Sequence, residues 1–127
     1  MESKKFRNKK RNYPGMRNIT IRGKGLKHDN RKPMWNLLPW VEMEEVVRVL
    51  TWGAKKYSPN SWKLVKEGEG RYFSACLRHL AAIGQKRYSD PETGLNHYSH
   101  AVCSLLFAFY HHRRNNGQAK RDRNSRE

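Results

Sequence analysis

Apolar residues recur at spacings of three and four in three segments of the chain, which is the periodicity of amphipathic helices. The first segment covers about residues 39–57, and a Ser-Pro-Asn-Ser stretch at 58–61 ends it. The second covers about residues 71–87, and the third about residues 95–113. Because no convincing run of alternating strand positions accompanies them, the pattern predicts an all-α fold, a small bundle of three main helices.

Charge is concentrated at the two ends of the chain. The 127 residues include 27 Lys and Arg against 11 Asp and Glu, a formal net charge of +16. Residues 1–28 hold ten of these basic residues against one acid, and residues 111–127 hold six against two. Both ends are poor in large apolar residues and cannot bury enough surface to offset the entropy of ordering. We therefore expect flexible basic arms at 1–26 and 113–127 around a helical domain at 27–112.

The composition also bears on setting and partners. The sequence has no apolar run of about 18 residues, so we expect no transmembrane helix. Two cysteines, Cys76 and Cys103, make no disulfide framework, and we expect a reducing, cytoplasmic compartment. The basic arms would attract nucleic acid without sequence preference through counterion release, or would only confer solubility. Sequence-specific readout has no support from a recognisable motif.

Acidic and histidine side chains gather at one end of the expected antiparallel bundle. Glu42 and Glu45 fall three residues apart on the apolar face of the first helix, where carboxylates need partners or a cation. Alternatively, both complement the helix dipole in its first turns and touch water. His79 lies about one turn deeper, as a catalytic candidate or as a satisfied core histidine. The expected metal-binding set is Glu42, Glu45, Asp90, Glu92, His97 and His100.

The donor types favour particular metals. Mixed oxygen and nitrogen donors suit Mg²⁺, Mn²⁺ or a harder transition metal, and we expect Mg²⁺ or Mn²⁺ rather than Zn²⁺. A zinc alternative exists because Cys76-x2-His79 and His100-x2-Cys103 have zinc-ligand spacing. In an antiparallel alignment His79 lies opposite Cys103, whereas Cys76 lies opposite Leu106, which argues against a four-ligand site.

Several short motifs resemble, in order, a known family. They are Lys27-His28-Asp29-Asn30-Arg31-Lys32-Pro33, Gly53-Ala54-Lys55-Lys56-Tyr57, Asn60-x-Trp62, Arg78-His79-Leu80, Asp90-x-Glu92-x-Gly94-Leu95 and His97-x2-His100-Ala101. Over about residues 27–110 the chain resembles the phage-associated domain named dATP/dGTP diphosphohydrolase, N-terminal. That name implies a relationship to the MazG-like nucleoside triphosphate pyrophosphohydrolases, which are helical, usually oligomeric and Mg²⁺-dependent.

The resemblance implies an activity and a set of residues for it. MazG-like enzymes carry Glu-x2-Glu on one helix and Glu-x2-Asp on the next; Glu42-x2-Glu45 matches the first, whereas Arg78-His79 stands where the second would be. The resemblance implies a metal-dependent hydrolase that converts dATP or dGTP to monophosphate and pyrophosphate, in the host cytoplasm if a phage encodes it. The expected catalytic residues are Glu42, Glu45, His79, Asp90, His97 and His100. The expected substrate-binding residues are Lys55, Lys56, Tyr57, Asn60, Trp62 and Arg78.

Two further expectations follow from the residues. The absent second acidic motif and the charge of +16 favour an alternative function, a non-catalytic phage accessory protein that binds nucleotides or nucleic acid through its basic arms. The third helix is apolar around most of its circumference, with Leu105, Leu106 and Phe109 beyond the reach of two neighbouring helices. We expect a homodimer to cover this surface, unless the segment at 35–40 folds back over it.

Overall fold

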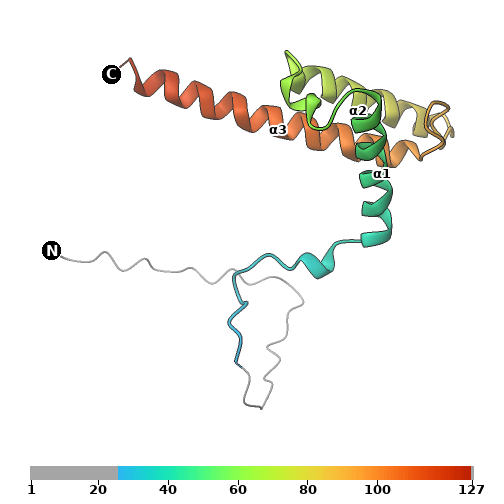
Figure 1. The fold of residues 1–127 in the computed structure, drawn as a ribbon, viewed down its shortest axis with the longest axis horizontal. Helices are drawn as coiled ribbons and strands as arrows, with labels where there is room; N and C mark the ends of the chain where they lie inside the picture. Colours follow the sequence, from blue (N-terminus) through green and yellow to red (C-terminus); the bar gives the residue numbers. More distant parts are fainter. Residues whose placement is uncertain (1–25, 127) are drawn as a thin grey trace. The chain divides into compact units, whose positions relative to one another are not determined.

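The computed structural model describes residues 26–126, and the arm expected at 1–26 lies almost entirely outside them. The elements, in chain order, are η1 (Trp35–Leu37), α1 (Trp40–Lys56), η2 (Ser61–Leu64), α2 (Gly68–Gly84) and α3 (His97–Asn124). The described residues contain three α-helices and no strand, which confirms the all-α prediction (Figure 1).

Residues 26–33 belong to a separate unit from the helices. A turn forms there as the Lys32 amide donates to the Asp29 carbonyl at 3.0 Å. Lys27 and Lys32 place their ammonium groups 3.4 and 3.7 Å from the Asp29 carboxylate. These charges are exposed, so they contribute little to stability.

Helices α2 and α3 lie side by side and antiparallel along the length of α2. The sequence periodicity explains this pairing, because Tyr72, Cys76 and His79 follow at spacings of four and three and turn toward α3. The Tyr72 ring meets the Phe107 ring edge-on at 5.0 Å. The pair is the framework on which the remaining elements pack.

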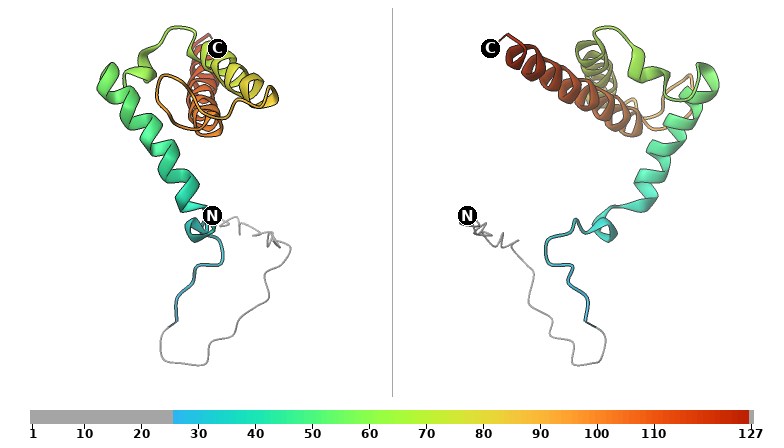
Figure 2. Two further views of the ribbon diagram at one scale, coloured as in Figure 1. Left: turned by 90° about the vertical axis from the view of Figure 1, so that its right-hand side faces the viewer. Right: turned by 60° about the vertical axis from the view of Figure 1, so that its left-hand side comes forward.

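Helix α1 crosses α3 rather than lying antiparallel beside α2 (Figure 2). Val46 and Val49, one turn apart on α1, are buried with Cys103 of α3. Partly buried apolar side chains surround these three: Met43, Leu50, Leu95 and Phe107. The apolar face predicted for the first helix is therefore confirmed, whereas its antiparallel alignment with the second helix is wrong.

The connection between α1 and α2 is held against α3 by aromatic stacking. The Trp62 ring of η2 stacks on Phe107 with ring centroids 4.1 Å apart. His111 Nε2 donates to the Trp62 carbonyl oxygen at 2.9 Å, and the His111 ring lies directly against Gly68. Glu67 takes a positive φ of 55° just before α2, so the chain reverses there and the helix begins three residues before the expected Arg71.

Helix α3 is longer than the pattern predicts. Asn96 caps its first turn by accepting a hydrogen bond from the Tyr98 amide at 2.9 Å. The helix was expected to end near Arg113, but it continues to Asn124, so the segment expected as a flexible tail is helical over this range. Side-chain bonds one turn apart support the extension, including Gln118 to Asp122 at 2.8 Å.

No helix among residues 26–126 is long and apolar enough to cross a membrane.

Candidate metal centre

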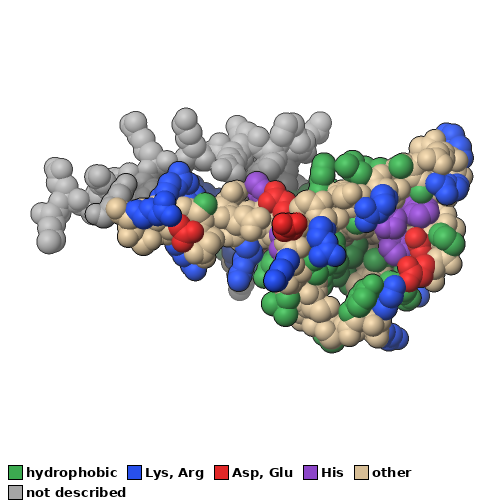
Figure 3. All heavy atoms as spheres, turned by 90° about the horizontal axis from the view of Figure 1, so that it is seen from above, with side chains coloured by type: hydrophobic (Ala, Val, Ile, Leu, Met, Phe, Trp, Pro, Cys, Tyr) green, Lys and Arg blue, Asp and Glu red, His purple; other side chains and the backbone are tan. Residues whose placement is uncertain are grey.

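Histidine and acidic side chains meet where α2 ends and α3 begins, as the sequence predicts (Figure 3). His79 comes from α2, His97 and His100 come from the first turns of α3, and Asp90 comes from the loop between these helices. His97 and His100 are buried, and His79 and Asp90 are partly buried. Three chain segments therefore bring four titratable groups together within a largely water-excluded end of the helix pair.

Three of these side chains have the geometry of a cation site. Ligand atoms from His79, Asp90 and His97 all lie within 4.8 Å of one another. His79 Nδ1 and His97 Nδ1 are 2.8 Å apart. At this distance one imidazole donates a hydrogen bond to the other, and a small opening of the pair would bring both nitrogens to the separation of roughly 3.0–3.4 Å at which two ligands, each about 2.1 Å from one ion, lie.

The loop that carries Asp90 is fixed by its own hydrogen bonds. Asp90 Oδ1 accepts bonds from the Glu92 amide, the Thr93 amide and the Thr93 hydroxyl, at 3.0, 3.0 and 3.2 Å. The Asp90 amide donates to the Leu95 carbonyl at 2.8 Å, and Gly94 closes the turn with a φ of 73° that glycine adopts without strain. Because these bonds fall on Oδ1, Oδ2 is the oxygen available to a cation.

The electrostatics of the cluster favour the protonation states that bind a metal. Burial, followed by the charges of the neighbouring imidazoles, lowers the pKa of His79. Burial also lowers the pKa of His100, although Asp90 acts in the opposite direction. Burial acts to raise the pKa of Asp90, but hydrogen bonds from Thr93 and the proximity of His100 outweigh it and leave that pKa below its usual value. Neutral imidazoles beside an ionised carboxylate are the ligand forms that a divalent cation requires.

His100 lies behind this group of three. Its ring stacks on the His79 ring at 4.7 Å, and its Nε2 lies 2.7 Å from the Thr93 hydroxyl and 3.9 Å from Asp90 Oδ1. His100 thus links the loop to both helices. Thr93, which sequence reasoning missed, connects Asp90 to His100; an Asp followed three residues later by Thr and then by Gly was the signal of a capped turn.

The three glutamates of the expected metal set lie elsewhere. Glu45 Oε1 accepts a hydrogen bond from the Asn96 amide at 2.7 Å and so ties α1 to the start of α3. Glu92 pairs with Lys56, its carboxylate 2.6 Å from the ammonium. Glu42 is exposed on α1. None of these glutamates joins the group of three found in residues 26–126, because Glu42 is exposed, Glu45 is held by the Asn96 amide and Glu92 is held by Lys56.

The zinc alternative finds no support in the geometry. Cys76 and Cys103 are both buried free thiols, and neither belongs to the group of potential ligands found in residues 26–126. Cys103 is packed with Val46 and Val49, and burial raises its pKa to about 12. A thiol that resists ionisation is a core side chain rather than a metal ligand.

A groove of about 1150 Å³ begins at His100 and runs between the end of α1, η2 and α2. Four of the six residues expected to bind substrate line it: Tyr57, Asn60, Trp62 and Arg78. Lys55 and Lys56 do not line it; Lys55 is exposed, and the Lys56 ammonium lies over the Trp52 and Tyr57 rings at 4.9 and 5.2 Å. Trp52 and Arg71, which the sequence analysis did not single out, also line the groove.

Asn60 has a positive φ of 62° at the turn that leads into η2, and asparagine tolerates this conformation better than most residues. Tyr57 is 71% exposed at the rim of the groove, whereas Trp62 is engaged with Phe107 in its wall. The Arg78 guanidinium donates to the Ser74 hydroxyl at 3.1 Å and is otherwise open to solvent. The groove therefore combines aromatic rings and a cationic side chain with His100 of the histidine cluster at one end.

The family model for dATP/dGTP diphosphohydrolase, N-terminal, matches residues 22–122. The chain belongs to this family. The match includes every residue of the histidine cluster and of the groove, and it extends along α3 beyond the boundary at 112 expected from the sequence. The histidine cluster and the groove thus both lie within the region that the family model covers.

A protein of Salmonella phage PMBT28 named dATP/dGTP diphosphohydrolase is 36% identical to this chain over 86 residues. The aligned region covers 68% of this chain but 29% of the phage protein, so the chain spans less than a third of that relative's length. No solved structure matches the chain.

Proposed function

We propose that this chain is a metal-dependent hydrolase of phage origin that cleaves dATP and dGTP to the monophosphate and pyrophosphate in the host cytoplasm. The observation that carries the proposal is the group of His79, Asp90 and His97, which stacks against His100 at the end of a groove that contains aromatic rings and Arg78. The name of the phage relative supports the purine deoxynucleotide as substrate.

The donor set fits a divalent transition metal. Two neutral imidazoles and one carboxylate suit Mn²⁺ better than Mg²⁺, which prefers oxygen ligands and retains its waters. Two histidines and one carboxylate also form catalytic zinc sites. We propose Mn²⁺ as the working ion, held by His79, Asp90 and His97. Bound there, it would neutralise negative charge on the phosphate oxygens.

The remaining residues would orient the substrate and handle the proton. The exposed Tyr57 ring would stack on the purine, and Arg78 would bind phosphate oxygens. His100, neutral because of its lowered pKa and adjacent to the groove, would accept a proton from the attacking water. Asp90, 3.9 Å from His100, would then stabilise the imidazolium. Water adds across the bond between the α- and β-phosphates, and pyrophosphate leaves.

Incubation with each deoxynucleoside triphosphate and with Mg²⁺, Mn²⁺, Co²⁺ or Zn²⁺, followed by separation of products, tests the activity. We expect dAMP and dGMP with pyrophosphate, and loss of both in Asp90→Asn. Asp122→Asn, on the exposed extension of α3, is the matched control and should retain activity. Absence of monophosphate with every metal and nucleotide would refute the proposal.

Glu42 and Glu45 remain candidates that this design also tests, because they match the Glu-x2-Glu motif of MazG-like enzymes. From the contacts of Glu45 with the Asn96 amide, we expect Glu45→Gln to impair folding or positioning more than chemistry. We expect Glu42→Gln to have little effect. A complete loss of hydrolysis in Glu42→Gln, with stability unchanged, would indicate that Glu42 and Glu45 of α1 bind the metal instead.

A second function has an observation in its favour. Residues 113–126, which include the end of α3, carry six Lys and Arg against one acid, and this stretch is exposed throughout. We infer that a non-catalytic protein could use this helix to bind nucleic acid through phosphate contacts. A salt titration of binding to DNA and RNA distinguishes the two functions. Binding that is weak even at low salt, or that persists without both basic ends, would exclude the second.

A further inference from the structure

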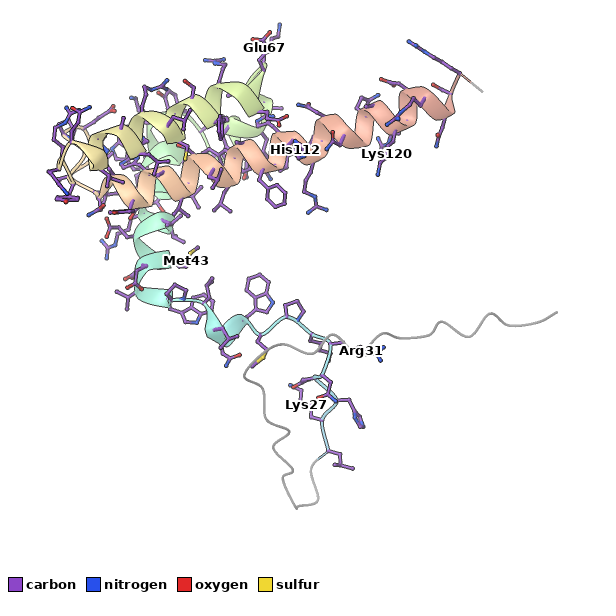
Figure 4. The ribbon with its side chains drawn as sticks, turned by 180° about the vertical axis from the view of Figure 1, so that it is seen from behind. Lys27, Arg31, Met43, Glu67, His112 and Lys120 are labelled. Atoms are coloured by element: carbon purple, nitrogen blue, oxygen red, sulfur yellow. The ribbon has the colours of Figure 1, made fainter. Side chains whose placement is uncertain are left out.

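Lys56, the last residue of α1, connects that helix to the loop between α2 and α3, residues 85–96, which we call the Asp90 loop. Figure 4 shows α1 running from the labelled Met43 toward the α2–α3 pair. At the end of α1 the Lys56 ammonium lies 2.6 Å from Oε1 of Glu92, a residue 36 positions further along the chain. The Glu92 amide in turn donates to Asp90 Oδ1 at 3.0 Å. Through Glu92, Lys56 is therefore linked to a proposed metal ligand.

The same ammonium also lies against the aromatic rim of the groove. Lys56 Nζ is 4.9 Å from the centre of the Trp52 ring and 5.2 Å from the centre of the Tyr57 ring. Both distances are within the roughly 6 Å over which a cation is attracted to an aromatic ring. Trp52 and Tyr57 line the groove, and Tyr57 is the ring proposed to stack on the purine. One side chain thus contacts both the proposed purine platform and the Asp90 loop.

We propose that Lys56 is a positioning residue that couples purine binding in the groove to cation binding at the histidine cluster. A purine stacked on Tyr57 would fix that ring, and with it the Lys56 ammonium. Lys56 would then hold Glu92 and the Asp90 loop where the Asp90 carboxylate can reach a cation. The coupling is reciprocal, because a cation that fixes the loop also fixes Lys56 against the rings. This inference rests on the proposed function, since it takes the cation and the purine of that site as its ligands.

The contacts of Lys56 favour positioning over direct phosphate binding. Lys56 does not line the groove, and Glu92 already compensates its charge. The two side chains are 40% and 58% exposed, and an ion pair this exposed contributes little to stability. A second tie from α1, between Glu45 and the Asn96 amide, remains when the pair is broken. Loss of the pair should therefore loosen the loop relative to α1 and leave the fold intact.

Mn²⁺ affinity measured with and without deoxyadenosine reports this coupling without requiring hydrolysis. Deoxyadenosine presents the purine but has no phosphate to chelate the metal in solution. With the unmodified full chain we expect saturating deoxyadenosine to tighten Mn²⁺ binding by about 5–20-fold, a factor typical of coupled sites. The factor should fall to about twofold or less in Lys56→Met and in Glu92→Gln. Lys56→Arg should retain most of it, because a guanidinium also contacts carboxylates and aromatic rings.

Arg48→Met is the matched control for the loss of a basic side chain from α1. Arg48 Nη2 lies 3.9 Å from Glu44 Oε1, so its ion pair stays within the helix, and this variant should keep the full coupling factor. Melting temperatures of all the variants should lie close to that of the unmodified chain, since both ion pairs are exposed. If Lys56→Met fails to fold, Glu92→Gln gives the same readout without touching the aromatic contacts.

Binding of tripolyphosphate in the absence of metal separates positioning from direct phosphate contact. If Lys56 positions the loop, Lys56→Met and Glu92→Gln should both leave tripolyphosphate affinity nearly unchanged. If Lys56 binds phosphate, Lys56→Met should weaken this affinity and Glu92→Gln, which frees the ammonium, should strengthen it. That second result would overturn the proposal.

The coupling factors give two further decisive outcomes. Equal factors in the unmodified chain and in Lys56→Met, or no effect of deoxyadenosine on the unmodified chain, would overturn the proposal. A deoxyadenosine effect that depends on Lys56, in a chain that hydrolyses no nucleotide, would support the coupling and refute only the proposed function.

Discussion

Gly68 begins α2 against the buried ring of His111, and this contact makes Gly68→Ala a sharp test of how the groove is built. An added Cβ would lie 2.5 Å from His111 Cδ2 and Cε1, well inside the contact distance of about 3.5–4.0 Å. His111 has little freedom to move, because its Nε2 donates to the Trp62 carbonyl and its ring stacks with Tyr72 at 5.8 Å. The methyl group would therefore displace the residue that holds the wall of the groove.

The magnitude follows from two opposing effects. Overpacking a core typically costs about 1–3 kcal/mol, whereas replacing glycine with alanine inside a helix stabilises by up to about 1 kcal/mol. We expect Gly68→Ala to lower the free energy of unfolding by about 1–2 kcal/mol. For a domain of this size the melting temperature should fall by roughly 4–16 °C.

Gly70→Ala is the matched control, because nothing lies within 4 Å of a Cβ at Gly70 in the same turn of α2. Thermal unfolding followed by circular dichroism should show Gly70→Ala unchanged or stabilised, and Gly68→Ala destabilised. Nucleotide affinity measured below both transitions should fall for Gly68→Ala alone, because Trp62 lines the groove. Equal melting temperatures for the two variants would refute the packing of His111 on Gly68.

The other predictions concern the metal centre and the groove. Thr93→Val removes the hydroxyl between Asp90 and His100 and should weaken Mn²⁺ binding by about 10–100-fold in calorimetry, whereas Thr51→Val, which loses only a bond to its own helix, should not. Burial lowers the pKa of His79 and of His100 from 6.5, so the unfolded chain binds more protons and the metal-free protein should lose stability as pH falls below about 6.5. Replacing both histidines with Gln should flatten this dependence in thermal unfolding; an unchanged slope would contradict it. Tyr57→Ala should raise KM for dATP by about 5–150-fold and Tyr57→Phe should restore it, since stacking contributes roughly 1–3 kcal/mol per base; equal KM values for the two variants would exclude stacking.

Local periodicity predicted the helices, but their mutual arrangement depended on contacts distant in sequence. Val46 and Val49 identified the buried face of α1, yet nothing local indicated that this face crosses α3. The sequence did not predict the extension of α3, because the segment after residue 113 has few apolar residues. Its helix is supported instead by bonds one turn apart, from Gln118 to Asp122 and from Arg123 to the Ala119 carbonyl. Helical propensity and side-chain pairs can thus maintain a helix without a buried face.

The same distinction applies to the candidate site. Asp90, His97 and His100 were predicted together because a short loop and one helix turn fix their separation. The sequence places His79 about one helical turn away from the other histidines, whereas its ring contacts both His97 and His100. An alignment of helix backbones does not show how far a side chain extends. Glu42 was predicted as a metal ligand on the assumption that the first helix lies antiparallel to the second. In the structure α1 crosses α3, and Glu42 is not part of the group of potential ligands.

The central claim is that His79, Asp90 and His97 hold a divalent cation, and anomalous diffraction from crystals grown with Mn²⁺ and a non-hydrolysable dATP analogue tests it most directly. The account predicts one strong anomalous peak between the Nδ1 atoms of His79 and His97 and the Asp90 carboxylate, with the triphosphate beside it. A peak at Glu42 and Glu45, with none at the histidine cluster, would contradict it.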